Sequence, residues 1–260
     1  MISELLSYLG VYRIYQRWLR EQIEQNPKPK HIGIIMDGNR RWAKSHSLIP
    51  WQGHQEGANK VEEFLQWCID LDIKTVTLYS FSTENFNRDE EEVRELMKLF
   101  ERTLEDVKES DRIHKYRVSI KAIGRIDELP PRLKELIKEV EGATKGYSDY
   151  YINIAIAYGG RAEIVDATRE IARLVKENRL EPEEIDENTI EENLYTAHLP
   201  QQDPDLVIRT SGEFRMSNFL VWQAAYSEIF IVDVYWPAFR KLDFMRAIRG
   251  YQQRSRRYGK

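Results

Sequence analysis

Cysteine, long apolar runs and charge of one sign are all scarce in this chain, and each scarcity excludes a class of protein. Cys68 is the single cysteine among 260 residues, so neither a disulfide framework nor a cysteine-rich metal site can form. No stretch approaches about 18 uninterrupted apolar residues, the length that a membrane-spanning helix needs. The net charge of −4 gives no positive field for nucleic acid. With no secretory signal pattern, we expect a cytoplasmic protein without a nucleic-acid partner.

Several signature motifs of common enzymes are also missing. There is no Walker phosphate loop and no G-x-G-x-x-G, so ATP and NAD are poorly supported. No H-E-x-x-H zinc pair and no G-x-S-x-G nucleophile elbow occurs, which argues against zincins and α/β-hydrolases. The chemistry must therefore come from other polar segments.

Strand-like and helix-like stretches alternate along most of the chain. The strand-like stretches are β-branched or apolar, and the helical ones place apolar residues on one face. Such alternation predicts an α/β fold with one mostly parallel central sheet and helices on both faces. No linker or internal repeat is visible, so we expect a single domain over residues 1–260. The predicted strands are 32–36, 75–81, 117–123, 151–157, 206–208 and 229–234, and the predicted helices are 56–71, 90–107, 133–140, 160–176, 184–194 and 242–257.

The first 25 residues or so predict an amphipathic helix. Its apolar side chains recur at helical spacing, and arginines lie between them. Packing against the protein body is the default interpretation, and contact with a membrane surface is the alternative that the aromatic content leaves open. The apolar positions are Leu5, Leu9, Tyr12, Tyr15, Leu19 and Ile23, and the arginines are Arg13, Arg17 and Arg20.

The most informative stretch is residues 31–44, HIGIIMDGNRRWAK. An apolar run ends in Asp37, flexible backbone and two arginines, as expected where a buried strand opens into a polar turn. A carboxylate can hold Mg²⁺, and arginines with loop amides can hold phosphoryl oxygens. The arrangement suits a metal-bound diphosphate, although a plain polar turn would look similar in isolation.

Three more polar segments follow predicted strands directly. They begin at Ser82, Gly159 and Arg209. Ligands of open parallel sheets lie beyond the carboxyl ends of the strands. We therefore expect these segments and Asp37 along one rim of the sheet.

The segment 81–88, FSTENFNR, gathers hydroxyls, an amide, a carboxylate and an arginine around Phe86. Its bland interpretation is a capping turn for the next helix, with Ser82 or Thr83 bonding locally. Capping accounts for one hydroxyl and leaves the other polar groups unexplained.

The segment 205–228, DLVIRTSGEFRMSNFLVWQAAYSE, resembles a second anion pocket. Arg209 leaves a strand, a Thr-Ser-Gly turn follows, and Arg215 comes next; arginine suits bidentate phosphate contacts. The alternative is that Glu213 and Glu228 merely neutralise the arginine pair. His54 is similarly open, since it could contact phosphate or serve the structure.

Five motifs taken in order, MDGNRRWAK, GHQEGANKVEEF, FSTENFNR, YINIAIAYGGR and DLVIRTSGEFRMSNFLVWQAAYSEIF, resemble the cis-prenyltransferase family. The resemblance covers about residues 31–259. It implies helices around a hydrophobic tunnel, a homodimer and dependence on Mg²⁺. The implied reaction condenses isopentenyl diphosphate onto an allylic primer, farnesyl or geranylgeranyl diphosphate, giving a long-chain polyprenyl diphosphate that precedes a glycosyl carrier lipid.

The resemblance also implies roles for residues. Asp37 would bind Mg²⁺ and assist departure of the allylic diphosphate, Asn85 would take part in proton removal, and Glu228 would help hold Mg²⁺. Arg209, Arg215 and Ser217 would bind isopentenyl diphosphate, as would a tail motif at residues 257–259. The implied substrate-binding residues are Gly38, Asn39, Arg40, Arg41, Trp42, His54, Ser82, Thr83, Glu84, Phe86, Arg88, Arg209, Arg215, Met216 and Ser217.

The chain departs from the bacterial pattern at four positions. Bacterial members usually carry Gly, Arg, Trp and Asn where Arg40, Pro50, Phe86 and Ala157 stand. These differences favour the archaeal or eukaryotic side of the family. Pro50 cannot bind phosphate as an arginine would, and Arg40 is a candidate to bind it instead.

A hydrophobic tunnel needs an apolar wall, and helix 90–107 is our candidate through Leu96, Met97, Phe100 and Leu104. Ordinary core packing is the alternative for each of these side chains. A non-catalytic subunit of a heteromeric synthase is the competing class of function. Such relatives lose the motif Asp and much of the second segment, which this chain retains.

Overall fold

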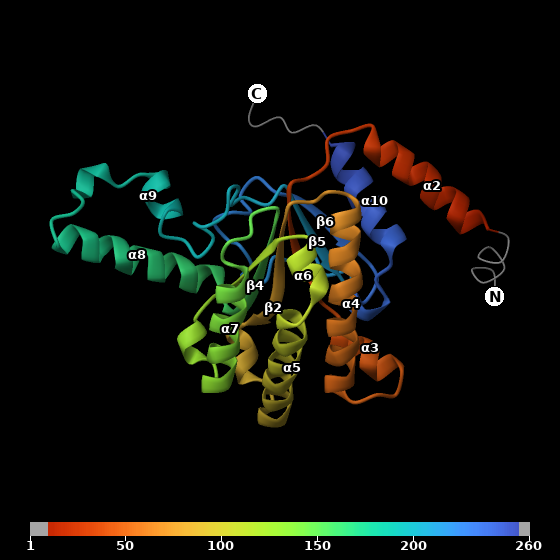
Figure 1. Ribbon diagram of the computed structural model, residues 1–260, viewed down its shortest axis with the longest axis horizontal. Helices are drawn as coiled ribbons and strands as arrows, with labels where there is room; N and C mark the ends of the chain where they lie inside the picture. Colours follow the sequence, from red (N-terminus) through yellow and green to blue (C-terminus); the bar gives the residue numbers. More distant parts are fainter. Residues whose placement is uncertain (1–9, 255–260) are drawn as a thin grey trace.

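The computed structural model describes residues 10–254 of the chain. Six strands form one sheet in the order β3-β4-β2-β1-β5-β6, and every neighbouring pair is parallel. Figure 1 shows the sheet at the centre of the molecule. The predicted α/β class with one central sheet is confirmed. The strands are β1 (His31–Ile35), β2 (Thr75–Ser82), β3 (Val118–Ile123), β4 (Tyr150–Tyr158), β5 (Leu206–Thr210) and β6 (Glu228–Val232).

Strand β1 lies in the interior of the sheet, paired with β2 on one side and β5 on the other. All five of its residues are buried. A strand buried on both faces reads as a continuous apolar run rather than an alternating one, which is why residues 32–36 predicted it within one residue at each end.

The helices of the described part are α2 (Val11–Glu24), α3 (Asn39–Ser45), α4 (Pro50–Asp70), α5 (Glu90–Lys108), α6 (Asp111–Lys115), α7 (Pro131–Thr144), α8 (Gly160–Lys176), α9 (Glu187–Glu191) and α10 (Lys241–Gln252). Helix α4 begins six residues before its predicted start, with Pro50 at its first position, where the missing N–H costs nothing. The predicted helix 184–194 is wrong in length. The Asp186 side chain caps Thr189 N, α9 ends at Glu191, and none of its residues is buried.

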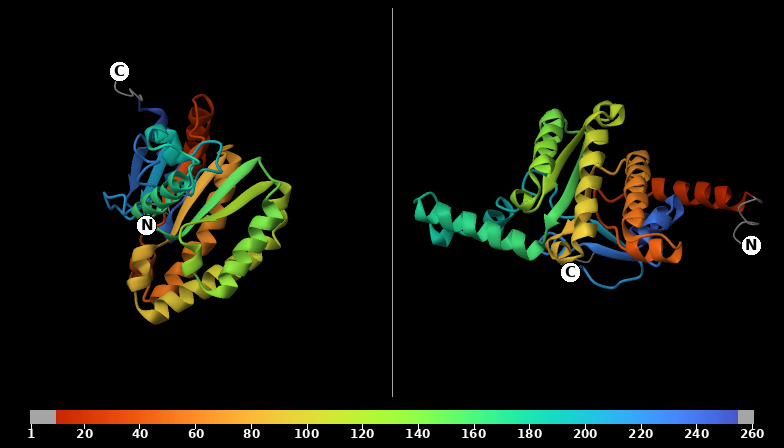
Figure 2. Two further views of the ribbon diagram at one scale, coloured as in Figure 1. Left: turned by 90° about the vertical axis from the view of Figure 1, so that its left-hand side faces the viewer. Right: turned by 90° about the horizontal axis from the view of Figure 1, so that it is seen from below.

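Helices α4, α5, α7 and α10 share one large apolar core with alternate residues of the strands, among them Ile32, Ile34 and Leu78. The opposite face carries a smaller apolar cluster that includes Ile35, Val207 and Phe219. Figure 2 shows that α8 starts at the sheet and then extends away from it as an arm. Helices therefore contact both faces of the sheet, but they cover the face with the larger core much more completely.

The short helix α3 was not predicted, because only seven residues separate Gly38 from the turn at His46. Gly38 adopts φ 102° and lets the chain reverse directly from β1 into α3. Gly53 then allows α4 to touch α3, since a Cβ there would lie 2.2 Å from Asn39 O. The polar turn at the end of β1 is thus a rigid strand–helix junction.

The N-terminal helix is confirmed over the described residues 11–24, and its predicted part at 1–9 lies outside them. Leu19 and Ile23 are buried, and α2 packs against α10. Ile14 and Trp18 are 70% and 50% exposed. Within residues 10–254, no helix is long and apolar enough to cross a membrane.

Candidate active site

Asp37 lies at the carboxyl end of β1, beside the end of β5. The register pairs Ile35 with Arg209, so Arg209 emerges next to Asp37. The Thr210 hydroxyl donates to Asp37 O at 2.7 Å and fixes the backbone. Ser82 ends β2 and Gly159 follows β4. The expected polar rim along neighbouring parallel strands is therefore confirmed.

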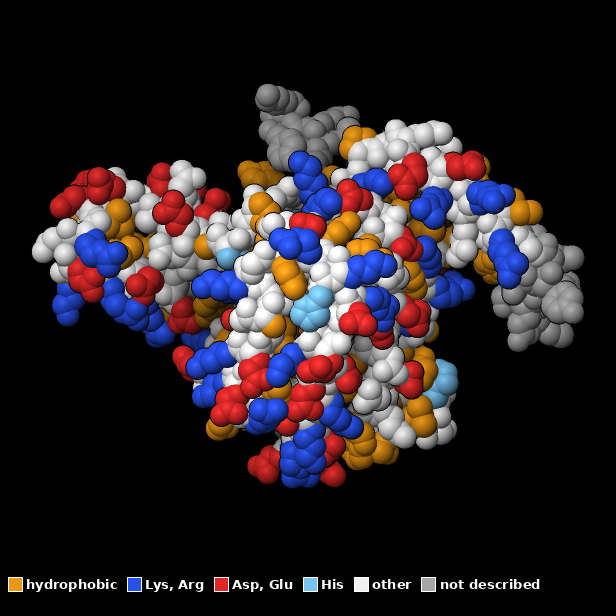
Figure 3. Space-filling model, viewed as in Figure 1, with side chains coloured by type: hydrophobic (Ala, Val, Ile, Leu, Met, Phe, Trp, Pro, Cys, Tyr) orange, Lys and Arg blue, Asp and Glu red, His pale blue; other side chains and the backbone are white. Residues whose placement is uncertain are grey.

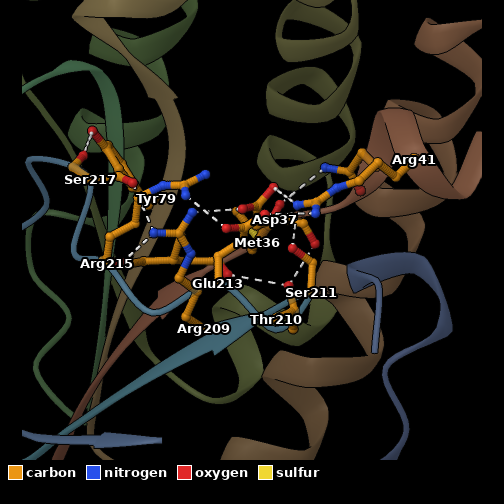
Figure 4. Close-up of polar contacts among 12 residues, drawn as sticks. Met36, Asp37, Arg41, Tyr79, Arg209, Thr210, Ser211, Glu213, Arg215 and Ser217 are labelled. Atoms are coloured by element: carbon orange, nitrogen blue, oxygen red, sulfur yellow. Dashed lines mark hydrogen bonds and ion pairs between the residues drawn. The ribbon is translucent and has the colours of Figure 1, made fainter. Parts of the chain in front are cut away.

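The Asp37 carboxylate is held between two guanidiniums (Figure 4). Arg209 Nη2 donates to Asp37 Oδ2 at 2.7 Å, and Arg41 Nη2 donates to Oδ1 at 3.2 Å. Burial raises the pKa of Asp37, but the hydrogen bond and charge of Arg209, with those of Arg41, outweigh it and leave the pKa lowered. Asp37 is therefore ionised and can serve as an anionic ligand.

Arg209 also organises the turn that follows β5. Its guanidinium is almost wholly buried, and Nη1 donates to Ser217 Oγ at 2.8 Å and to the carbonyl of Arg215. Glu213 pairs with Arg215 at 2.7 Å and with Arg41 at 2.9 Å. The alternative interpretation of this segment is therefore half right: Glu213 does neutralise arginines, but Arg209 is paired with Asp37.

A second group of basic side chains surrounds Glu92, a residue that the sequence did not single out. Glu92 Oε1 accepts from Arg88 Nη1 at 3.1 Å and lies 3.3 Å from His54 Nε2. Arg40 Nε lies 3.7 Å from Oε2. The hydrogen bond from His54 is the largest of the effects that lower the pKa of Glu92. The spacing from Arg88 to Glu92, four residues, was the available clue.

The two adjacent arginines of α3 face different groups. Arg40 reaches Glu92, whereas Arg41 reaches Asp37, Ser211 and Glu213. Successive helical residues are about 100° apart around the axis, which separates them. The rim thus holds two distinct clusters of positive charge.

The second polar segment contributes mainly local contacts. Ser82 N donates to Asn85 Oδ1 at 3.1 Å, and the Thr83 hydroxyl donates to Glu84. The capping interpretation is correct for the turn at 83–87, but the cap of α5 is Asp89, which accepts from Glu91 N. Glu84 also accepts from Asn218 Nδ2 at 2.9 Å, which ties this segment to the turn after β5.

A cavity of about 350 Å³ begins beside this rim and runs between α4, α5 and the sheet. Its polar end includes Asn39 and His54, and its walls are apolar over most of their length. Leu96, Phe100 and Leu104 line it as predicted, but Met97 does not. Met97 instead faces an open groove of about 500 Å³ on another side of α5, together with Phe86.

Trp42 and Phe86, the two aromatic residues among the implied substrate-binding residues, are not on the cavity wall. Phe86 lines the outer groove and packs edge-on against Phe81, with ring centroids 4.9 Å apart. Trp42 stacks on His46 at 4.2 Å. Met216 packs against the smaller apolar cluster. Tyr79, which the sequence analysis missed, does line the cavity and donates to Ser217 O at 3.0 Å.

Glu228 is not brought to Asp37, which contradicts a shared metal ion within one copy of the chain. Glu228 is the first residue of β6 and pairs in register with Leu206, at the amino end of β5. Asp37 lies at the opposite, carboxyl edge, so the length of a parallel strand separates them. Glu228 forms an ion pair with Arg254 instead. The tail motif at 257–259 lies outside the described residues.

The fold and the rim together define a class of protein: an α/β protein with two groups of basic side chains on one rim of a parallel sheet, beside an apolar cavity. The family model described as undecaprenyl diphosphate synthase matches residues 35–259. The chain therefore belongs to the undecaprenyl diphosphate synthase family, the cis-prenyltransferases.

Relatives of known name cover nearly the whole chain. A tritrans,polycis-undecaprenyl-diphosphate synthase (geranylgeranyl-diphosphate specific) of Methanopyrus kandleri is 53% identical over 98% of this chain and 93% of its own. The protein of that name from Thermococcus kodakarensis is 52% identical over both full lengths. These matches agree with the archaeal side of the family.

Solved structures agree with the fold. Lavandulyl diphosphate synthase from Lavandula x intermedia, in complex with dimethylallyl diphosphate, superposes with a TM-score of 0.86 at 37% identity, covering 90% of this chain and 99% of that one. A probable undecaprenyl diphosphate synthase from Campylobacter jejuni gives 0.73 at 31% identity, covering 90% and 100%.

Proposed function

We propose that this cis-prenyltransferase condenses isopentenyl diphosphate repeatedly onto geranylgeranyl diphosphate and releases a long-chain polyprenyl diphosphate. One observation carries the proposal: an ionised Asp37, paired with Arg209 and Arg41, shares one rim of the sheet with a second group of basic side chains around Glu92, beside an apolar cavity whose polar end includes Asn39 and His54. The two substrates each bring a diphosphate, and the growing product brings an apolar chain. The curated relatives named for geranylgeranyl diphosphate support this primer over farnesyl diphosphate.

The two cation clusters divide the substrates between them. Arg40, His54 and Arg88 lie next to the cavity mouth and would hold the primer diphosphate, with the backbone of Gly38 and Asn39. Charge that develops on this leaving group is stabilised by fixed cations in a partly buried site. Burial lowers the pKa of Arg88, so a second anion beside Glu92 would stabilise its charge further.

Arg209, Arg215 and Ser217 would hold isopentenyl diphosphate, on the other side of Asp37. Ser82 ends the adjoining strand β2, and Glu84 and Asn85 lie in the turn that follows it. These three residues would position the reacting carbons, with Asn85 assisting proton removal. Arg41 contacts Asp37, Ser211 and Glu213, so it belongs to this second pocket.

Magnesium fits this site only in combination with the substrates. Among the described residues there is no cluster of three His, Cys, Asp or Glu side chains that could hold a metal. Mg²⁺ typically binds through one or two carboxylates and completes its shell with phosphates and water, so Asp37 with a diphosphate is a suitable donor set. When bound, the ion would neutralise the leaving diphosphate as a Lewis acid.

The exposed apolar side chains after β5 and on edge strand β6 favour a homodimer. Val221, Tyr226 and Ile229 are 44%, 74% and 40% exposed. Burying such a surface against a second copy would remove it from water. Light scattering on the purified protein should give twice the chain mass, and Ile229→Glu should shift it toward the monomer.

The outer side of α2 favours peripheral contact with an anionic membrane. Exposed Ile14 and Trp18 lie beside arginines that include Arg13 and Arg17, and Figure 3 shows basic and apolar side chains together along this helix. A basic, amphipathic surface of this kind binds acidic lipid headgroups. Vesicles with phosphatidylglycerol should retain the protein in sedimentation, and Trp18→Ser should weaken that retention.

The activity itself is tested with labelled isopentenyl diphosphate and primers of two, three and four isoprene units. We expect Mg²⁺-dependent polyprenyl product with geranylgeranyl diphosphate as the best primer. Asp37→Asn, which keeps the size of the side chain, should abolish it, whereas the exposed control Glu91→Gln should not. A folded wild-type protein that makes no product from any primer would refute the proposal and favour a non-catalytic subunit.

A further inference from the structure

Glu163 of α8 is a wholly buried carboxylate outside the two cation clusters. It accepts hydrogen bonds from the Tyr158 hydroxyl, from Tyr195 N at 2.9 Å and from Gln223 Nε2 at 3.0 Å. Burying a carboxylate is costly unless its oxygens are satisfied. Burial raises the pKa of Glu163, and these three donors oppose that rise. Keeping a carboxylate buried at this position costs folding free energy, which suggests that Glu163 has a specific role.

The first turn of α8 holds the turn after β5 at two points. At the near end, Gly160 N donates to Asn218 O at 2.7 Å and Arg161 N donates to Asn218 Oδ1 at 2.9 Å. At the far end, Glu163 accepts from Gln223, whose amide also donates to Thr196 Oγ1 at 2.9 Å. The segment 218–223 is therefore clamped between residues 160 and 163.

The clamped segment adopts backbone conformations that it would not keep unaided. Ser217, Asn218 and Leu220 all have positive φ, at 49°, 64° and 43°. Non-glycine residues in the left-handed region persist only where their surroundings fix them. Ser217 directly precedes the clamped segment, and its hydroxyl accepts from Arg209 at 2.8 Å.

The aromatic rings around the clamp connect it to the substrate pocket. Tyr158 packs edge-on against Tyr79, with ring centroids 6.0 Å apart, and Tyr79 stacks on Phe219 at 4.7 Å. The Tyr79 hydroxyl donates to Ser217 O at 3.0 Å. Packed side chains therefore connect Glu163 to Ser217, in addition to the backbone.

We propose that Glu163 is a positioning residue for isopentenyl diphosphate, because it fixes the strained turn that presents Ser217 and the Arg215 carbonyl to Arg209. The inference rests on the proposed function, in which this turn binds isopentenyl diphosphate. Glu163 touches neither substrate. Its loss acts on one pocket and leaves the Glu92 cluster, which belongs to other elements, in place.

The test compares Glu163→Ala, Glu163→Gln and the matched control Glu170→Gln, an exposed carboxylate on the same helix. Glu163→Ala should raise the KM for isopentenyl diphosphate about tenfold or more, since small displacements of binding groups cost this much. The KM for geranylgeranyl diphosphate should stay unchanged. Glu163→Gln keeps an oxygen for Tyr195 N and Gln223 and should restore most of the affinity, and Glu170→Gln should match the wild type.

If Glu163→Ala does not fold, Gln223→Met tests the same contact from its other side, because Gln223 donates to Glu163. This substitution removes the far anchor while Glu163 keeps its hydrogen bonds from the Tyr158 hydroxyl and Tyr195 N, and it should also raise only the KM for isopentenyl diphosphate. Equal increases in both KM values, or unchanged values in well-folded variants, would overturn the inference.

Calorimetric titration with isopentenyl diphosphate alone separates this inference from the proposed function. Weaker binding by Glu163→Ala supports the positioning role even if the wild type forms no polyprenyl product. Unchanged binding by Glu163→Ala overturns it, even if the wild type is fully active.

Discussion

Arg209 and Asp37 form an ion pair, and removing either partner should change the stability of the protein by a very different amount. The Arg209 side chain is 4% exposed and that of Asp37 is 27% exposed. Asp37→Ala leaves a buried guanidinium with only neutral acceptors, Ser217 Oγ and the Arg215 carbonyl. An unpaired buried charge costs about 3–5 kcal/mol of unfolding free energy.

Removing Arg209 instead of Asp37 should lower the free energy of unfolding by less. Arg209→Met removes the buried cation itself and leaves Asp37 partly in water and still paired with Arg41 at 3.2 Å. We expect a loss of about 1–3 kcal/mol from the unsatisfied polar groups. Both variants should lack activity, so stability and catalysis have to be measured separately.

Urea unfolding at pH 7 measures these differences, provided that the dependence on urea is the same in all variants. The double variant Asp37→Ala/Arg209→Met should be more stable than Asp37→Ala alone, because the orphaned charge is gone. Glu213→Ala is the control: it breaks pairs with the largely exposed Arg41 and Arg215 and should cost at most about 1 kcal/mol. If Asp37→Ala costs no more than Arg209→Met, the expected penalty for a buried guanidinium is refuted.

Three further predictions follow from the packing. Burial lowers the pKa of His31 to about 4, so the unfolded chain takes up a proton before the folded protein does. The free energy of unfolding should therefore fall by about 3 kcal/mol as the pH drops from about 6.5 to about 4. Urea titrations should find this loss reduced in His31→Gln. Leu104→Trp should narrow the cavity and shorten the products seen by chromatography, whereas Met97→Trp, on the outer groove, should leave their length unchanged. Gly53→Ala would place a Cβ 2.2 Å from Asn39 O, so it should lower stability by about 1–3 kcal/mol in thermal unfolding, and an unchanged midpoint would show that α3 can move aside.

Local sequence patterns were enough to predict the sheet and the position of its polar rim. Apolar runs such as residues 32–36 identify strands buried on both faces, because such strands need no polar alternation. Polar residues placed directly after these runs, including Asp37 and Arg209, had to meet at one edge of a parallel sheet. These inferences need only the local pattern and the common direction of the strands, and the structure confirms both.

The partners of these residues, in contrast, depend on contacts that form only when the chain folds. Adjacent Arg40 and Arg41 join different clusters, because helical rotation turns them apart and the residues that receive them come from distant segments. Glu228 follows the anion motif in sequence but lies at the opposite edge of the sheet. The connection between parallel strands β5 and β6 returns the chain to the amino end of the sheet, and β6 begins there with Glu228. Glu92 and Glu163 were overlooked for the same reason. A buried carboxylate acquires its role from the donors that folding gathers around it, and no local pattern records those donors.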